Sequence, residues 1–378
     1  MKKYILLAVA ALTLSAACTK VETVAPDQKI AFDVVNYATQ TRANTVFAEE
    51  WANASFFTNA WYYPTPNDNP QPYMDNVEIK LTEGAWQPDE AYYWPRTGLI
   101  NFFSYASKKP LSNNYLTAGN GTFTINEYTV TADDNIMIAD AVYNAGKNDH
   151  NADGALVVTG DNQTNNYKGV PTLFRHLLSQ ISVNVQLKTA QEIKGTNAFE
   201  ATLTGATIKN VANVGSLALT AGTTQATGLA TAAWTPASDG TQVGWTLPAS
   251  TVSTENITLE VHNTVLKINA DTKESENVNL LNNRTVLPQA LTAGDPATAT
   301  VVALEIAFQL VTKHGDTAYA TENVTLTANL RSEAVASWNM NQRIVYNVTI
   351  DPVGEVITFD PAVAAWVEAP AQTVPFSL

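Results

Sequence analysis

The chain has 378 residues, of which 45% are apolar and 15% are charged. This apolar fraction excludes an intrinsically disordered chain, and the length predicts two domains of ordinary size. The formal net charge of −14 disfavours nucleic-acid partners, because phosphate binding needs an excess of Lys and Arg. The single cysteine excludes an internal disulfide framework.

The first residues predict an export signal. Lys2 and Lys3 precede a short apolar run over residues 4–14, and small residues then lead to Cys18. This order describes a secretory signal peptide, residues 1–17, whose apolar run is too short to span a bilayer. The only cysteine directly after it resembles a bacterial lipobox, in which the thiol is lipidated, although Ser15 stands where a lipobox usually has Leu. We expect lipidation at Cys18 and no transmembrane helix; the alternative is an ordinary secretory signal followed by a free thiol.

Beyond the signal, apolar and polar residues alternate along many segments. This alternation predicts half-buried strands of antiparallel sheets. The clearest predicted strands are 30–35, 181–188, 257–261, 302–310, 324–330 and 344–350. Turn residues separate them, and no helical periodicity extends beyond about three turns. We therefore predict an all-β chain with two β-sandwich domains in tandem.

The predicted organisation has four parts. They are the signal peptide 1–17, an anchor and propeptide 18–42 that carries the first strand, an N-terminal sandwich 28–175, and a C-terminal sandwich 176–378 that ends in a donor-strand segment. The boundary follows an Asn/Asp/Gly-rich stretch and precedes the strongly alternating strand that begins at Ile181.

No arrangement typical of an enzyme or a cofactor site occurs in the sequence. His150, His176, His262 and His314 lack the spacing of a zinc motif, and we expect His176 to be a structural residue. The string 149–154 matches the first half of a calcium-binding loop, but the required glutamate is replaced by glycine, so an ordinary turn is favoured. We predict no catalytic residue, no metal site and no cofactor.

Aromatic residues are dense between residues 51 and 94, and include Trp61 and Trp94. We favour core packing between strands for these rings. The alternative is that they are exposed and stack on sugar rings or on a partner.

Six segments, taken in order, resemble the Bacteroidota fimbrillin family (FimA/Mfa-like pilins). They are Trp86 with 92–106 (YYWPRTGLINFFSYA), 134–139 (DNIMIA), 173–181 (LFRHLLSQI), 286–289 (VLPQ), 338–346 (WNMNQRIVY) and 357–366 (ITFDPAVAAW). Two departures are that Gln180 replaces a lysine and that 338–346 lacks the family's glycine. The matches span nearly the whole chain, and their order carries the resemblance.

The resemblance implies tandem transthyretin-like β-sandwiches that polymerise by strand exchange. In fimbrillins, a trypsin-like protease cuts the lipidated precursor after an arginine behind the first strand, and a terminal strand of the next subunit fills the vacated groove. The corresponding cut here lies between Arg42 and Ala43. The exchanged first strand would contribute Ile30, Phe32 and Val34. The donor strand would contribute Val363, Ala365, Val367, Val374, Phe376 and Leu378.

Elementary physics supports this mechanism. A sandwich that lacks a strand exposes unpaired backbone groups beside an apolar cleft, and a partner strand repairs both. We expect the segment 30–35 to be a removable edge of the N-terminal sandwich. Pro370 and Pro375 suit a donor strand that is paired on one side. The alternatives are that Arg42 is incidental and that the tail is a strand of its own domain.

The expected partners are other pilin subunits, the outer membrane through the lipid anchor, and a trypsin-like protease. The expected location is the outer membrane for the precursor and a cell-surface fimbria for the mature protein, with adhesion to a host glycan or protein ligand as its role. Two other interpretations are a monomeric glycan-binding or tip-adhesin lipoprotein and an uncut anchor subunit. Thr317, within 316–318, resembles the O-glycosylation site of Bacteroidota.

Overall fold

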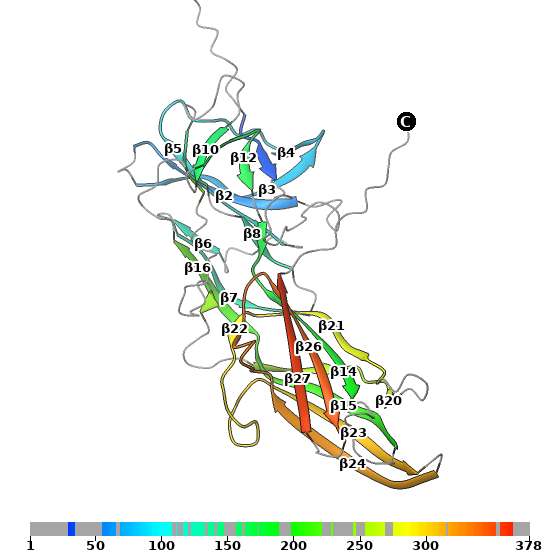
Figure 1. Cartoon of the computed structure of the whole chain (residues 1–378). Helices are drawn as coiled ribbons and strands as arrows, with labels where there is room; N and C mark the ends of the chain where they lie inside the picture. The colour runs from blue at the N-terminus through cyan, green and yellow to red at the C-terminus, as the bar shows by residue number, and fades with distance from the viewer. Residues whose placement is uncertain are drawn as a thin grey trace, which may run out of the picture.

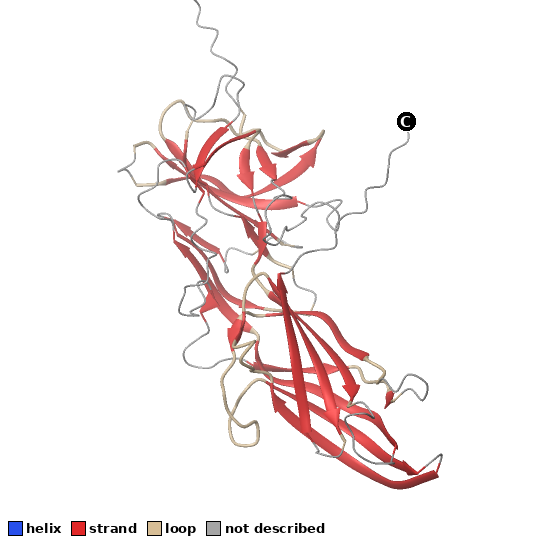
Figure 2. Cartoon of the chain, in the orientation of Figure 1, coloured by secondary structure: helices blue, strands red, loops and turns tan. Residues whose placement is uncertain are grey.

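The fold is known from a computed structural model. It describes residues 29–34, 55–65, 69–107, 111, 116–119, 122–132, 135–139, 142–146, 156–160, 163–172, 174–188, 198–220, 228–229, 245–246, 254–268, 275–314, 317–352 and 356–365. Every regular element in these ranges is a β-strand, as Figure 2 shows, which confirms the all-β prediction. Within the same ranges, no helix is long and apolar enough to cross a membrane. The sheets are arranged along an elongated molecule, with the first strands at one end and the last strands at the other (Figure 1).

The largest sheet formed by the described residues has ten strands. Its main path runs, in spatial order, through β12 (Val170–Thr172), β1 (Phe32–Val34), β4 (Ala85–Pro88), β3 (Gln71–Thr82), β2 (Ser55–Tyr63), β5 (Leu99–Ala106), β8 (Met137–Ala139) and β13 (Phe174–His176). Beside this path, β9 (Val142–Ala145) pairs with β5 and with β17 (Gly228–Leu229).

The two strands at the ends of this path, β12 and β13, follow each other directly in the sequence. Residue 173 alone separates β12 from β13; β12 pairs with β1, and β13 pairs with β8. The sheet therefore curls round an interior, which we call the N-terminal core. Its buried members are Ile30, Phe32, Phe56, Ala60, Met74, Ile79, Trp94, Ile100, Phe102, Ala106, Met137, Ala139, Val170 and Phe174.

The opposite face of β2 and β5 belongs to a second core. There Phe57 and Tyr105 are buried in one cluster with Ile125 and Leu217. The latter two come from a sheet of β18 (Trp245–Thr246), β16 (Val214–Thr220), β7 (Thr122–Thr129) and β6 (Leu116–Gly119). This sheet combines strands from before and after residue 175. The boundary between 175 and 176 stays a prediction. A separate hairpin pairs β10 (Leu156–Gly160) with β11 (Gln163–Tyr167).

The C-terminal part is a sandwich of two further sheets. One consists of β21 (Val278–Val286), β14 (Ser179–Leu187), β26 (Gln342–Asp351) and β27 (Val356–Ala365). The other consists of β19 (Thr254–Leu259), β15 (Ala198–Ala212), β23 (Ala303–His314) and β24 (Thr317–Asn329), with β20 (Val265–Lys267) on β15. A short pair, β22 (Gln289–Ala290) and β25 (Ser337–Trp338), lies beside them.

The alternation in the sequence explains this sandwich. On β26, and on β14 from Val183 onward, every second residue is buried, for example Val183, Val185, Ile344 and Val348. These side chains form one cluster with β15 and β23. Each such side chain contributes about 1.5–3 kcal/mol when fully buried. Five predicted strands, all except 30–35, correspond to β14, β19, β23, β24 and β26, which are confirmed with shifted ends. The segment 30–35 corresponds to β1, and Val35 lies outside the described residues.

Several residues within the segments 286–289 and 338–346, which were singled out in the sequence, have structural roles. The Trp338 Nε1 donates to the hydroxyl of Tyr346 at 2.8 Å, and both side chains are fully buried. The amide of Gln289 is buried as well, and its Oε1 accepts a hydrogen bond from the Ala212 N–H at 3.1 Å. Such bonds satisfy polar groups that burial would otherwise penalise.

His176 lies on β13 and has no exposed surface. Its Nδ1 is 2.8 Å from the Asn135 Oδ1. Burial lowers the pKa of His176 to about 3, and the positive charge of Arg343 acts in the same direction. The ring is therefore neutral at physiological pH, as expected of a structural histidine.

Folding stability is expected to fall as the pH drops from about 6.5 toward 3, because the unfolded chain binds a proton at His176 that the folded chain excludes. At pH 5 the loss due to this residue is about 2 kcal/mol. Urea unfolding at pH 7 and pH 5 measures it. His176→Gln should remove this part of the pH dependence, whereas His262→Gln, at an exposed site, should not. Equal pH dependence in wild type and His176→Gln would contradict the assignment.

Candidate strand-exchange site

The first strand lies inside a sheet. β1 pairs in parallel with β12 through Phe32↔Val170, Asp33↔Pro171 and Val34↔Thr172. On its other side Phe32 pairs with Trp86 of β4, and Lys29 forms a bridge with Tyr93. The expectation of an edge strand is therefore wrong. The parallel partner β12 occupies the side that the edge interpretation left open.

Backbone hydrogen bonds secure the strand on both sides. The Ile30 N–H donates to the Tyr92 carbonyl at 2.8 Å, on the side of β4. The Val170 N–H donates to the Ala31 carbonyl at 2.8 Å, on the side of β12. Removing β1 would leave two rows of backbone groups facing each other across an empty slot, which is costly unless water or another strand satisfies them.

The apolar side chains of β1 fill the N-terminal core. Ile30 and Phe32 are 2% and 4% exposed. The Phe32 ring contacts Phe56 and Phe102 edge to face, with centroid separations of 5.4 and 5.9 Å. Val34 is half-buried against the same core. Burial of Ile30 and Phe32 together contributes roughly 3–6 kcal/mol.

The outer side of the strand is polar and closely packed. The Lys168 N–H donates to the Asp33 Oδ2 at 3.1 Å. At Gly169 the two backbones are so close that an added Cβ would lie 2.5 Å from the Ala31 carbonyl oxygen. Only glycine fits there without a shift of the backbone. Sequence reasoning missed Lys168 and Gly169, and a lone Lys-Gly pair before a three-residue strand offers no signal from which to find them.

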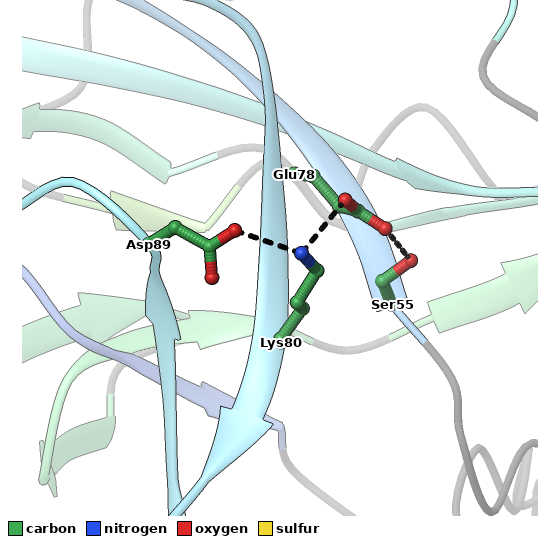
Figure 3. Close-up of polar contacts among 4 residues, drawn as sticks. All are labelled: Ser55, Glu78, Lys80 and Asp89. Carbon is green, nitrogen blue, oxygen red and sulfur yellow. Dashed lines mark hydrogen bonds and ion pairs between the residues drawn. The ribbon is translucent and has the colours of Figure 1, made fainter.

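The wall formed by β4 is attached to β3. The two strands form a hairpin with four paired positions. Figure 3 shows the Lys80 ammonium of β3 between two carboxylates, 2.8 Å from Asp89 and 3.2 Å from Glu78. Its hydrogen bonds to Asp89 and then Glu78 raise the pKa of Lys80. Ser55 on β2 donates to Glu78, which extends the contact to a third strand. This wall does not depend on β1 for its attachment.

The predicted donor residues lie in different places. Val363 and Ala365 belong to β27, where they pair with Ile344 and Gln342 of the same chain's β26. Val363 is 44% exposed. The remaining predicted residues, namely Cys18, Arg42, Ala43, Val367, Val374, Phe376 and Leu378, lie outside the described residues.

The tryptophans proposed for glycan stacking are mainly buried. Trp61 and Trp94 are 7% and 5% exposed, as the core interpretation predicted. Tyr93 is the exposed member of its cluster, at 41%. Thr317 is exposed at the start of β24, and the calcium-like string 149–154 lies outside the described residues.

The described residues show no metal-binding constellation. Within these ranges, no group of three or more His, Cys, Asp or Glu side chains could share a metal ion. The strand-exchange prediction concerns the slot that β1 occupies between β12 and β4.

A family model described as fimbrillin-like matches residues 41–366. No curated protein matches the chain. Among solved structures, a fimbrial protein from Bacteroides vulgatus has 16% identity and a TM-score of 0.52, with 90% of this chain and 100% of that chain covered. This likeness shows the fold alone.

A second solved structure is the tip fimbrial protein Mfa3 from Porphyromonas gingivalis. It has 9% identity and a TM-score of 0.32 over 89% of this chain and 100% of that chain, and it carries no weight here. The family match extends over most of the sequence and includes the strands that surround the slot. The chain belongs to the fimbrillin-like family.

Proposed function

We propose that this protein is a fimbrial subunit that polymerises when β1 is replaced by a strand of another subunit. Family membership supports the coarse part of the proposal: a structural, non-enzymatic protein of a cell-surface fimbria or adhesion system, with other pilin subunits as partners. The finer part comprises export as a lipoprotein on Cys18, cleavage between Arg42 and Ala43, and exchange of the strand that carries Ile30, Phe32 and Val34.

The observation that supports the exchange step is that β1 is paired with a strand on each side. The strand fills a slot with hydrogen-bonding groups on both walls and an apolar floor. A cut after Arg42 leaves β1 on the piece that precedes Ala43. After the cut, β1 and the rest of the protein are two separate molecules. The peptide link that kept β1 at a high effective concentration near the slot is then lost. A strand from a neighbouring subunit can then compete for the slot.

The competing interpretation, a monomeric glycan-binding lipoprotein, loses its proposed binding residues. Trp61 and Trp94 are core residues, so replacing either one would destabilise the fold rather than test ligand binding. The uncut anchor subunit remains a distinct outcome of the cleavage experiment below.

We expect the close packing of β1 against the chain before β12 to depend on Gly169. Gly169→Ala places a methyl group against the Ala31 backbone and should lower the free energy of unfolding by about 1–3 kcal/mol. Hydrogen exchange at the Phe32 and Asp33 amides should accelerate together with this loss. Gly205→Ala is the matched control, since its Cβ would meet only the Ala307 Cβ at 3.8 Å. Equal behaviour of the two variants would show that the close approach at Gly169 is unimportant.

Cleavage is expected to trigger assembly. Trypsin treatment of the purified precursor should give a body that begins at Ala43 and forms ladders of oligomers in mild SDS. Arg42→Ala should abolish both the cut and the ladder. Arg96→Ala, which removes an exposed arginine in the described body, should change neither. N-terminal sequencing and light scattering measure the outcome, and a cut protein that stays monomeric at high concentration refutes the polymerisation proposal.

A further inference from the structure

We infer that the loop between β22 and β23, residues 291–302, closes a binding cavity for a neutral sugar residue on the outer face of the C-terminal sandwich. The cavity has a volume of about 420 Å³. This volume falls within the usual range of about 300–1,000 Å³ for small-molecule sites. The inference goes beyond the proposed function, because it concerns a different part of the chain and does not depend on strand exchange.

Three neighbouring strands form the floor of the cavity. β23 lies between β15 and β24 (Figure 1). Leu304 of β23 is buried in the core of the sandwich, so Ala303 and Glu305 on either side of it face outward, because side chains alternate along a strand. Lys209 of β15 pairs with Ala303, and Thr327 of β24 pairs with Glu305. The Lys209 ammonium forms an ion pair with the Glu305 carboxylate across the floor.

The loop 291–302 is fixed beside this floor by one asparagine amide from each flanking strand. The Asn329 Nδ2 of β24 donates to the Thr292 and Gly294 carbonyls, both at 2.9 Å. The Asn210 Nδ2 of β15 donates to the Val301 carbonyl at 2.9 Å. Both ends of the loop are therefore held before any ligand arrives. A cavity that is formed in advance loses little conformational entropy on binding.

A tight turn within the loop places Asp295 at the cavity. The Asp295 carbonyl accepts from the Thr298 and Ala299 N–H groups at 3.0 and 2.9 Å. The Asp295 Oδ1 accepts from the Ala297 N–H at 2.9 Å. Within the described part of the chain, the Asp295 Oδ2 has no hydrogen-bond partner. This oxygen is therefore available to accept a hydrogen bond from a ligand.

The polar groups of the cavity match a neutral ligand that carries several hydroxyls. Lys209 and Glu305 neutralise each other, and their remaining N–H groups and lone pairs can still bind a ligand. The Asp295 Oδ2 and the Asn210 Oδ1 can accept, and the Thr327 hydroxyl can donate and accept. Each sugar hydroxyl both donates and accepts, as this mixed set requires. An ammonium group only donates, and its charge would lie close to that of Lys209.

Apolar groups complete the lining of the cavity. Pro296, Val301 and Ala303 lie among the polar residues around it. Ala303 is 2% exposed although it is on the outward side of β23, as expected of a residue beneath the loop. A sugar ring has apolar C–H groups as well as hydroxyls, and such surfaces can cover them. The cavity therefore offers both kinds of contact that a sugar needs.

Saturation-transfer NMR on the purified precursor tests for sugar binding. The probes are the methyl glycosides of glucose, galactose, mannose, fucose and N-acetylglucosamine. At least one of them should bind with a dissociation constant of about 1 mM, as expected for a ligand of this size. If none of the five binds at about 10 mM, the inference is overturned.

Two substitutions assign the binding to this cavity. Asp295→Asn keeps an oxygen for the Ala297 N–H but removes the charged acceptor, so it should weaken binding about 10- to 100-fold. Thr327→Val removes a hydroxyl and keeps the shape of the side chain, so it should weaken binding about 3- to 10-fold. Both variants should keep the thermal midpoint of the wild type, because neither residue is part of the core.

Thr321→Val is the matched control for Thr327→Val. Thr321 is exposed on the same side of β24 as Thr327, six residues earlier in the strand and about 20 Å away. Its replacement should leave the dissociation constant within about twofold of the wild type. Equal effects of the two threonine variants, or unchanged binding in Asp295→Asn, would place the sugar elsewhere and overturn the inference.

A lysine derivative separates a sugar site from a site for cations. N-acetyl-lysine methylamide should bind more weakly than the best glycoside. If it binds more tightly than every glycoside and loses its binding in Asp295→Asn, the cavity takes ammonium groups and the sugar inference is wrong. These outcomes are independent of the cleavage experiment, because the cavity is formed by β15, β23, β24 and the loop 291–302. Strand exchange can fail while sugar binding holds, and the reverse.

Discussion

The central constraint is that β1 must be satisfied on two sides at once. It is held by β12 in parallel, by β4 in antiparallel fashion, and by an apolar floor that Phe32 fills between two other phenylalanines. A strand in such a position cannot be left out without exposing both polar rows and the core. Any process that removes it must therefore supply a substitute, and the substitute must match both backbone and side-chain pattern.

The chain that forms one wall of the slot also continues into the C-terminal sandwich. The segment 170–187 begins as β12 beside β1, passes through β13, and becomes β14, an interior strand between β21 and β26. β1 therefore pairs with the same segment of chain that supplies an interior strand of the C-terminal sandwich.

Sequence patterns predicted the parts of this fold that depend on local alternation. Strands such as β14, β23 and β26 have one buried face, so a period of two is visible in their residues. The same reasoning could not place β1 in the sheet interior, because its parallel partner β12 is only three residues long and lies more than a hundred residues later. Nor could it find that β7 pairs with β16 across the expected boundary, since pairing between distant strands leaves no local signature. The sequence thus indicated the apolar residues of the candidate site. It did not indicate the strands on either side of them or the close approach at Gly169.

Two kinds of contact hold β1 in the slot, namely backbone hydrogen bonds on both sides and a buried aromatic ring. The walls offer backbone groups, which any extended chain can satisfy, so they provide affinity without discrimination. Discrimination comes from the apolar core, where the Phe32 ring lies between Phe56 and Phe102. If β1 were displaced by one residue, polar side chains such as that of Asp33 would face the core, so the register is fixed.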